Sequence, residues 1–369
     1  MQYCTKCLNV SMRPRITFNE KGVCGACQWD EAKKTTVDWN TRWKELERLC
    51  DKYRVKDGSS NWDVIVPCSG GKDGSYVAWR MKHDMGMHPL CMTLVPVLQT
   101  AIGRQNLDNF KKIGFDHIGI TANPKVYARL ARKGFREQGR PMLPSNDGIT
   151  TALLKFAIKL NIPFIVYGEE GESEYGGAMT QVEQREMDRA SMINCYYSGH
   201  EQTEYLNEFT REELKWWLLP SEEEMVNTGI FITQWSKYEN WDPYRHYLFS
   251  KEKCGFQTLP TRSIGTYTNF AQLDDDAQDL HAYLMFLKFG FGRTTSDVCI
   301  DIRRGALDRK QALSLVKKYD GEYPEELIPV YLEYFDMTQG EFDSVIDRFA
   351  NKELLKKVNG RWVRNFEPR

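Results

Sequence analysis

Residues 64 to 81 read VIVPCSGGKDGSYVAWRM, and this stretch decides the fold of the chain. The apolar run 64–66 is typical of a buried strand, and 76–81 is helix-like. Between them, Ser69 to Ser75 forms a loop of small residues in which two adjacent glycines let the backbone approach an anion closely. Backbone N–H groups and the dipole at a helix N-terminus both favour negative charge there. The stretch therefore predicts a phosphate-binding loop; the alternative is a glycine-rich turn without a ligand.

The loop is not a Walker A motif, because Val66 and Asp73 stand where that motif has Gly and Ser or Thr. It resembles the Ser-Gly-Gly-x-Asp-Ser loop of the N-type ATP pyrophosphatases, which include GMP synthetase, NAD synthetase, asparagine synthetase and several tRNA-thiolating enzymes. The resemblance implies that ATP is cut between its α and β phosphates. AMP then goes to a carbonyl or amide oxygen, from which a nucleophile displaces it. Gly74 departs from the pattern, and the hydroxyl follows one residue later at Ser75.

Length and composition are those of a globular protein. The 369 residues allow one large domain or two ordinary ones, with 41% hydrophobic and 27% charged residues. A net charge of −1 gives no electrostatic footprint for nucleic acid. No apolar run approaches the length of a transmembrane helix, and the N-terminus lacks a signal peptide pattern. We therefore expect a cytoplasmic protein that binds neither nucleic acid nor membranes.

Four of the ten cysteines form two closely spaced pairs, Cys4 with Cys7 and Cys24 with Cys27. A two-residue gap lets both thiolates of a pair face one ion, and four thiolates complete a closed, structural zinc shell. An iron–sulfur cluster is the alternative. The remaining cysteines show no pairing. Cys68 adjoins the phosphate loop, where a small buried apolar role is favoured over that of a nucleophile.

The order of the expected elements indicates an α/β fold with a parallel sheet flanked by helices. Short apolar runs alternate with helical patterns from residue 63 to residue 167. The expected strands are 63–67, 89–95, 116–120 and 163–167; the expected helices are 75–85, 103–113, 124–137 and 147–160.

We expect a zinc-binding module over 1–35, the ATP pyrophosphatase domain over 36–270 and a helical region over 271–369. Region 170–270 is expected to form loops and helices over the site. Asp38 and the pair Thr338 and Glu341 are expected helix N-terminal signals.

Two further stretches can carry chemistry. Residues 167–177 hold four carboxylates and four glycines after an expected strand, and Glu169 and Glu174 are the leading candidates for holding Mg²⁺ or a substrate. A solvated acidic loop is the alternative. Lys288 and Arg293 flank a glycine-rich corner and can meet phosphate oxygens, although a capped helix end explains the same residues. The six histidines show no ligand spacing, and each is expected to be a surface or core residue.

Taken together, these motifs resemble the N-acetyl sugar amidotransferases of bacterial surface-polysaccharide biosynthesis. The resemblance covers most of the chain and rests on residues 3–7, 22–27, 66–75, 98–107, 167–169, 174–177 and 288–293. It implies conversion of an acetamido group on a sugar, nucleotide-linked or free, to an acetamidino group, with ammonia from a separate glutaminase subunit. That glutaminase is often paired with a cyclase-like barrel protein.

The implied cofactors are ATP, Mg²⁺ and Zn²⁺. Ser69, Gly70, Gly71, Gly74 and Ser75 are assigned to the ATP phosphates, Lys72 to the departing pyrophosphate and Asp73 to Mg²⁺. Glu169 or Glu174 is assigned to metal or substrate. Two rival hypotheses remain. The first is a tRNA-thiolating ATP pyrophosphatase, but the sequence lacks the sulfur-handling cysteines near the loop and the basic character that this chemistry needs. The second is a zinc-stabilised ATP-binding scaffold without activity of its own.

Overall fold

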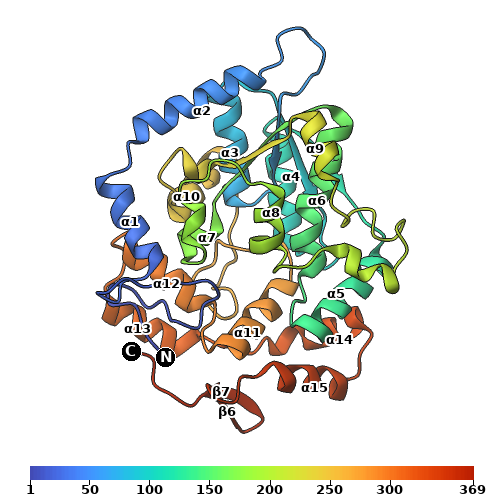
Figure 1. Cartoon of the computed structure of the whole chain (residues 1–369). Helices are drawn as coiled ribbons and strands as arrows, with labels where there is room; N and C mark the ends of the chain where they lie inside the picture. Colours follow the sequence, from blue (N-terminus) through green and yellow to red (C-terminus); the bar gives the residue numbers. More distant parts are fainter.

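A computed structural model describes residues 1–369, and its centre is a parallel sheet covered by helices on both faces (Figure 1). The five strands lie in the order β3-β2-β1-β4-β5, and every neighbouring pair is parallel. Their bounds are β1 Val64–Pro67, β2 Pro89–Leu94, β3 Asp116–Ile120, β4 Phe164–Tyr167 and β5 Phe231–Gln234. This confirms the predicted α/β class with a parallel sheet, and the four expected strands are all present.

Alternate strand residues point to opposite faces of the sheet, so each face has its own apolar core. Ile65 belongs to one cluster, with residues of helices α5 and α6. Val64 and Val66 belong to the other, with residues of α2, α3 and α4. Burial on both faces explains why the central strands β1, β2 and β4 are almost continuous apolar runs, whereas the edge strand β3 is polar and partly exposed. The helices concerned are α2 Trp39–Tyr53, α3 Lys72–His83, α4 Ala101–Lys112, α5 Pro124–Gln138 and α6 Leu143–Leu160.

The expectation of loops and helices alone over 170–270 is wrong at one place. Residues 231–234 form β5, which pairs with β4 and is the edge strand of the sheet. The rest of this region is helical or irregular, with α7 Gly171–Tyr175, α8 Arg189–Ser191, α9 Glu222–Thr228 and α10 Pro243–Lys253. A four-residue strand that begins shortly after a helix is too short to show a clear period, so the sheet, not the local sequence, defines it.

The C-terminal region is helical as expected, except for a final hairpin. Its helices are α11 Ala277–Phe289, α12 Arg293–Arg303, α13 Arg309–Tyr319, α14 Ile328–Phe335 and α15 Gln339–Phe349. The hairpin pairs β6 Leu355–Val358 with β7 Arg361–Arg364. No helix of the structure has both the length and the apolar character needed to cross a membrane.

The N-terminal cysteine segment packs on the C-terminal helices and not on the sheet. Its four cysteines share an apolar cluster with Val298 and Cys299 of α12 and Ala312 and Val316 of α13. Figure 1 shows the two chain ends close together beside these helices. Helix α1, Gly25–Thr35, continues the segment towards α7. The two regions at opposite ends of the sequence therefore form one side of the molecule.

Two expected helix starts are confirmed. The Asp38 carboxylate accepts hydrogen bonds from the backbone N–H groups of Asn40 and Thr41 and caps α2. Thr338 and Glu341 form a capping box at the start of α15. Helix α3 begins at Lys72, three residues before the expected start, so Lys72 and Asp73 lie in its first turn.

Candidate functional site

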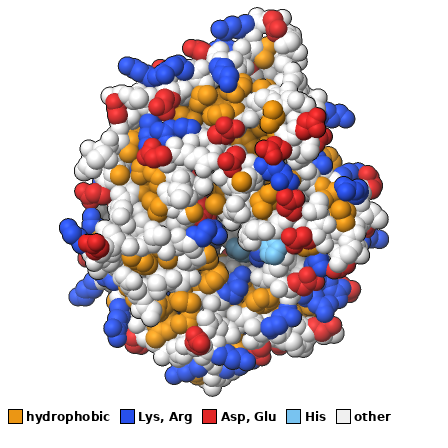
Figure 2. Space-filling view, in the orientation of Figure 1, with side chains coloured by type: hydrophobic (Ala, Val, Ile, Leu, Met, Phe, Trp, Pro, Cys, Tyr) orange, Lys and Arg blue, Asp and Glu red, His pale blue; other side chains and the backbone are white.

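The strand order places a site between β1 and β4. From β1 the chain moves outward to β2 and β3 on one side, whereas β4 and β5 lie on the other. Loops that follow β1 and β4 therefore diverge and leave a crevice at the carboxyl ends of the strands, where ligands bind in such sheets. A cavity of about 380 Å³ lies there, lined by residues that follow both strands. Figure 2 shows a hollow near the centre of this face, with histidine and basic side chains around it.

The cavity has two walls of different origin. The phosphate-loop wall consists of Ser69, Gly71, Lys72, Asp73 and Gly74, which follow β1, and of Glu169, which follows β4. The α12 wall consists of Arg13 from the N-terminal segment, Gln278 and His281 from α11, and Arg293, Ser296 and Asp297 from α12. Half of the lining thus comes from parts of the chain outside the sheet domain.

The loop has no room for a side chain at Gly70 or at Gly74. Gly70 has a φ of +86°, in the left-handed region, and a Cβ at this position would lie 2.4 Å from the Leu107 backbone nitrogen. A Cβ on Gly74 would lie 2.6 Å from the Pro67 carbonyl oxygen. The expected serine therefore has no room at residue 74. Gly71 is the N-cap of α3 and no side chain caps this helix, so its first N–H groups are available to an anion.

Lys72, Asp73 and Glu169 form a charged group inside the cavity. The Lys72 ammonium donates to the Asp73 carboxylate. Burial opposes ionisation of Asp73, yet Lys72 and His246 hold the pKa of Asp73 well below its ordinary value. Burial and the charge of Asp73 raise the pKa of Glu169 to about 7, against the opposing effect of Lys72. Glu169 is therefore about half ionised near neutral pH and can accept or release a proton.

Two buried side chains orient Asp73 from behind. The His246 imidazole is fully buried, and its Nδ1 lies 2.8 Å from Asp73 Oδ1. Trp241 Nε1 donates to the same oxygen at 3.3 Å. Burial lowers the pKa of His246 although Asp73 opposes this, so the ring is neutral and donates its Nδ1 hydrogen. The ring also stacks on Tyr76 at 3.8 Å between centroids. Asp73 is thus fixed in one orientation.

Arg293 is buried in the α12 wall with most of its hydrogen-bonding capacity unused. Its side chain is 5% exposed, and Nη2 donates to the Ala271 carbonyl oxygen at 2.6 Å. Nε and Nη1 have no hydrogen-bond partner, and the nearest carboxylate oxygen, of Asp297, lies 3.7 Å from Nε. A buried guanidinium with free donors needs a partner, so this residue is prepared for an oxygen-rich ligand.

Other predicted site residues lie outside the cavity lining. Glu174 is 3% exposed, and its carboxylate accepts from Trp29 Nε1 at 3.0 Å and Lys33 Nζ at 2.7 Å, both on α1. Lys288 donates to the Gly139 carbonyl oxygen at 3.0 Å at the end of α5, and burial lowers its pKa to about 8. Ser75 is fully buried behind the loop, 3.8 Å from the Cys68 sulfur, and Gly70 is buried beneath it. The structure therefore brings together only Lys72, Asp73, Glu169 and Arg293 of the predicted catalytic set.

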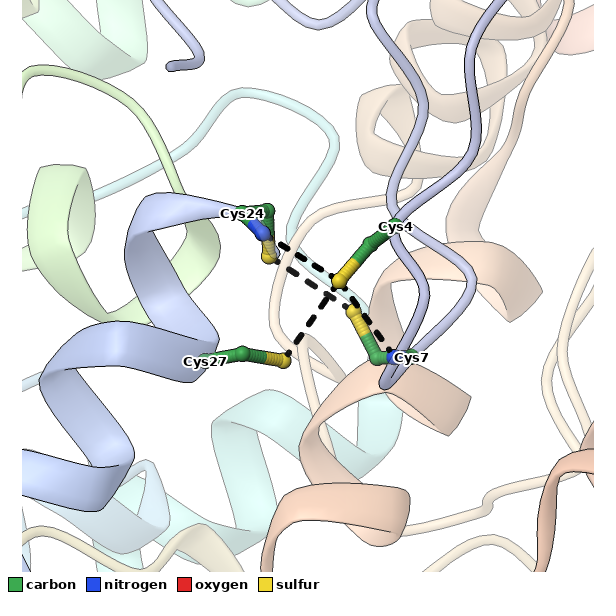
Figure 3. Close-up of side chains that lie close together, drawn as sticks. All are labelled: Cys4, Cys7, Cys24 and Cys27. Atoms are coloured by element: carbon green, nitrogen blue, oxygen red, sulfur yellow. Dashed lines mark hydrogen bonds between the residues drawn. The ribbon is translucent and has the colours of Figure 1, made fainter. Parts of the chain in front are cut away.

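The four paired cysteines converge, as Figure 3 shows. All four are buried, and their sulfur atoms lie within 4.8 Å of one another. The Cys4–Cys27 and Cys7–Cys24 sulfur separations are 3.9 and 3.7 Å. Four sulfurs at zinc-bond length in a tetrahedron lie about 3.8 Å apart. Backbone N–H groups of Lys6, Asn9 and Cys24 point at the sulfurs and would stabilise thiolates. The residues therefore fit a closed structural zinc site.

Three residues that line or support the site have no signal in the sequence. Arg13 reaches the cavity from the cysteine segment, His281 lines it from α11, and His246 orients Asp73 from α10. His281 Nδ1 is buried without a partner, and burial lowers its pKa to about 3. His246 is a buried residue, in line with the expectation that the histidines are surface or core residues, and tertiary packing also brings His246 and His281 to the site. No motif or spacing marks them.

Among the comparisons with known proteins, a family match covers the C-terminal part of the chain, which forms most of the α12 wall. Residues 264–367 match the family described as LPS biosynthesis protein WbpG-like, C-terminal domain. Among solved structures, the chain is similar to a predicted subunit of tRNA methyltransferase from Methanocaldococcus jannaschii, with 15% identity and a TM-score of 0.31, over 60% of this chain and 86% of that chain. The comparison with curated proteins found no match.

The matched region begins before α11 and includes the whole α12 wall except Arg13. It also contains Lys288 and Arg293, on which the resemblance to the surface-polysaccharide amidotransferases partly rests. The C-terminal region of this chain, from residue 264 to residue 367, is therefore similar to the WbpG-like C-terminal domains of lipopolysaccharide biosynthesis.

Proposed function

We propose that this chain is an ATP-using enzyme of surface-polysaccharide biosynthesis, an amidotransferase that converts an acetamido group on a sugar into an acetamidino group. The observation that carries the proposal is the composition of the cavity. One wall is a phosphate loop with an uncapped helix N-terminus, and the other belongs to the WbpG-like region and holds a buried arginine with free donors. ATP and an oxygen-rich acceptor can therefore meet in one cavity.

The proposed reaction proceeds in two steps that balance without water or a redox partner. The acetamido oxygen attacks the α phosphorus of ATP, an O–P bond forms, and pyrophosphate leaves. The resulting imidate carries AMP as a good leaving group. Ammonia then adds to the imidate carbon and AMP departs with the former amide oxygen, leaving a C=N bond in the product. The catalytic requirement is to position the two substrates and stabilise the charge of pyrophosphate and AMP.

The residues of the phosphate-loop wall suit these tasks. The N–H groups at the start of α3 would meet phosphate oxygens, and Lys72, in the same turn, would neutralise the departing pyrophosphate. ATP enters with Mg²⁺, which binds proteins through one or two carboxylates together with phosphates, and Asp73, whose pKa is held low, is the carboxylate of this wall that would bind it. With a pKa of about 7, Glu169 is also suited to take the proton that ammonia loses on addition.

The α12 wall would hold the acceptor. Arg293 Nε and Nη1 are buried donors without partners, and Gln278 and His281 add polar groups to the same wall. Ammonia is proposed to come from a separate glutaminase subunit working with a cyclase-like barrel protein, as the family resemblance implies. The chain itself carries no cysteine in a recognisable glutaminase context.

The tRNA-thiolating hypothesis is less well supported. Such chemistry needs an accessible sulfur nucleophile near the loop, but Cys68 is buried, and burial raises the pKa of its thiol to about 11. On the face drawn in Figure 2, basic and acidic side chains are interspersed and no broad basic field forms. Both features favour a small acceptor over tRNA.

The test is a reconstitution with ATP, Mg²⁺, ammonium chloride and a panel of acetamido sugars, free and nucleotide-linked. The expected products are AMP, pyrophosphate and a sugar lighter by the difference between O and NH. A heavy-oxygen label in the acetamido group should appear in AMP. ADP as the nucleotide product, or label retained in the sugar, would refute the mechanism. A sugar heavier by the exchange of oxygen for sulfur, with a sulfur donor, would support thiolation instead.

A further inference from the structure

The metal-binding segment reaches the cavity through a single side chain, Arg13. Arg13 Nη2 donates to Ser296 Oγ at 2.8 Å, and its guanidinium lies over the Phe291 ring at 4.5 Å from the centroid. These contacts hold it against the start of α12, beside Arg293, where it lines the cavity. A structural zinc module that only folded the N-terminus would not need to supply a residue to the site.

The hydrogen-bond partners of Arg13 are neutral. Nε donates to Asn9 Oδ1 at 3.1 Å and Nη2 to the Ser296 hydroxyl, while Nη1 makes no hydrogen bond within the chain. A guanidinium in a cavity with only neutral partners gains most from an anionic oxygen on a ligand. Since Arg13 bonds Ser296 of the α12 wall and no residue of the phosphate loop, we assign that oxygen to the acceptor.

Asn9 connects Arg13 with the cysteine cluster. Its side chain is 1% exposed and makes three contacts: Oδ1 accepts from Arg13, and Nδ2 donates to Cys24 Sγ at 3.6 Å and to the Tyr175 carbonyl oxygen at 3.2 Å. Its backbone N–H donates to Cys7 Sγ at 3.4 Å. N–H···S bonds of this kind favour deprotonated sulfur, the state that binds a metal. Tyr175 itself lines the cavity. Asn9 therefore contacts two metal-ligand candidates and two cavity residues at once.

We propose that Arg13 is an acceptor-binding residue and that the metal-loaded cysteine cluster holds it in the cavity through Asn9. The inference rests on the proposed function, because the acceptor is the acetamido sugar named there. It gives the cysteine module a role in substrate binding: loss of the metal releases Asn9, and Arg13 leaves the position from which it meets the acceptor.

The first test compares Arg13→Gln with Arg15→Gln in the reconstituted reaction. Arg15 lies two residues further along the same loop but is exposed and bonded to Glu172, with Nε 2.9 Å from Oε2, so it is a matched control. Loss of a charged hydrogen bond to the acceptor should raise the acceptor KM about ten- to a hundredfold. The KM for ATP should stay within about twofold, since the contact is made with the acceptor, and kcat should change little, since the bond is made in ground state and transition state alike.

Arg15→Gln should change neither constant. A raised KM for ATP with a normal acceptor KM would assign Arg13 to the nucleotide and overturn the inference. Normal constants in Arg13→Gln would overturn it as well. Absence of turnover in the unsubstituted protein with every sugar would instead refute the proposed function.

The second test needs no turnover and probes the link through Asn9. Phenylglyoxal modifies accessible arginines, and peptide mass spectrometry measures the rates at Arg13 and Arg15 separately. Removal of the metal with a chelator, and the Asn9→Ala variant with its metal content verified, should each raise the rate at Arg13 several-fold and leave Arg15 unchanged. An unchanged rate at Arg13 in both samples would overturn the link. Equal increases at both arginines would indicate general unfolding and overturn it too.

Discussion

The phosphate-loop wall of the cavity comes from two short stretches that follow adjacent strands, whereas the α12 wall is assembled from segments near residues 13, 278 and 296. The polar groups of the first wall already pair with one another, as Lys72 with Asp73 and Asp73 with His246. In the second wall, Arg293 and His281 keep buried atoms without partners. The first wall offers a ligand mainly the uncapped backbone N–H groups of α3, which suit a phosphate of any nucleotide. The second wall offers buried side-chain atoms without partners, which suit a specific ligand.

The difference between the two walls predicts two different effects of substitution on activity. Substitutions in the phosphate-loop wall should abolish chemistry with every acceptor, because this wall is the proposed ATP site. Substitutions in the α12 wall should weaken binding of the acceptor and leave the handling of ATP intact. The division of roles would be wrong if a substitution in the α12 wall impaired the handling of ATP, or if one in the phosphate-loop wall impaired only binding of the acceptor.

The largest effect is expected for Asp73→Asn. This change keeps the shape of the side chain but removes the charge that pairs with Lys72 and accepts from His246. Turnover should fall about a thousandfold, the scale of losing one group that stabilises developing charge. Pyrophosphate release measures it, and thermal unfolding should show that the fold persists. Full activity of the variant would exclude Asp73 from the mechanism, and absence of turnover in the unsubstituted protein, with function of its complex kept in the variant, would favour the scaffold hypothesis.

A smaller but diagnostic effect is expected from pH. Burial and Asp73 raise the pKa of Glu169 to about 7, so the fraction of ionised Glu169 increases as pH rises through that value. If Glu169 acts as the base for ammonia, kcat at saturating ammonia should fall tenfold per pH unit below about 7 and level off above it. Glu169→Gln should lower kcat about a hundredfold and make it independent of pH in this range. A pH dependence that survives in Glu169→Gln would assign the titration to another group.

The α12 wall is tested by Arg293→Gln against Lys288→Gln. The two cations flank the same corner, but only Arg293 lines the cavity, whereas the Lys288 ammonium donates to the Gly139 carbonyl oxygen. Arg293→Gln should raise the acceptor KM about ten- to a hundredfold with the KM for ATP unchanged. Lys288→Gln should leave both constants unchanged and reduce only stability. A raised acceptor KM in both variants would mean that the corner acts as one cationic site.

The sequence predicts well those features that depend on contiguous residues. The strand, loop and helix over residues 64–83, the other three expected strands and the cysteine quartet each leave a local pattern, and the structure contains all of them. Lys288 and Arg293 illustrate the limit. They are five residues apart in the sequence, but the chain changes direction between α11 and α12 and sends one to the end of α5 and the other into the cavity.

The residues that sequence reasoning missed are those whose role depends on distant contacts. His246 gains its role from Asp73, which lies 173 residues away, and Arg13 from Ser296, which lies 283 residues away. Neither has a neighbour in the sequence that marks it. Glu174 shows the opposite error: it stands in an acidic loop beside Glu169, but a helical turn, α7, directs it to Lys33 and Trp29 of α1. Proximity in sequence did not translate into proximity to the cavity.

The smallest expected effect concerns Gly74, where the ATP pyrophosphatases that the loop resembles have serine. A Cβ at this position would meet the Pro67 carbonyl oxygen at 2.6 Å and the Cys68 Cα at 2.9 Å, both parts of the backbone that cannot turn aside. Gly74→Ala and Gly74→Ser should therefore destabilise the protein by about 1–3 kcal/mol, the usual range for overpacking, measured by chemical denaturation. If the added hydroxyl reached the phosphates and restored the serine contact, Gly74→Ser would still bind ATP better than Gly74→Ala. Equal ATP affinity in the two variants would mean that the phosphate-loop wall works through backbone N–H groups and Lys72 alone, and that no serine hydroxyl is needed at its last position.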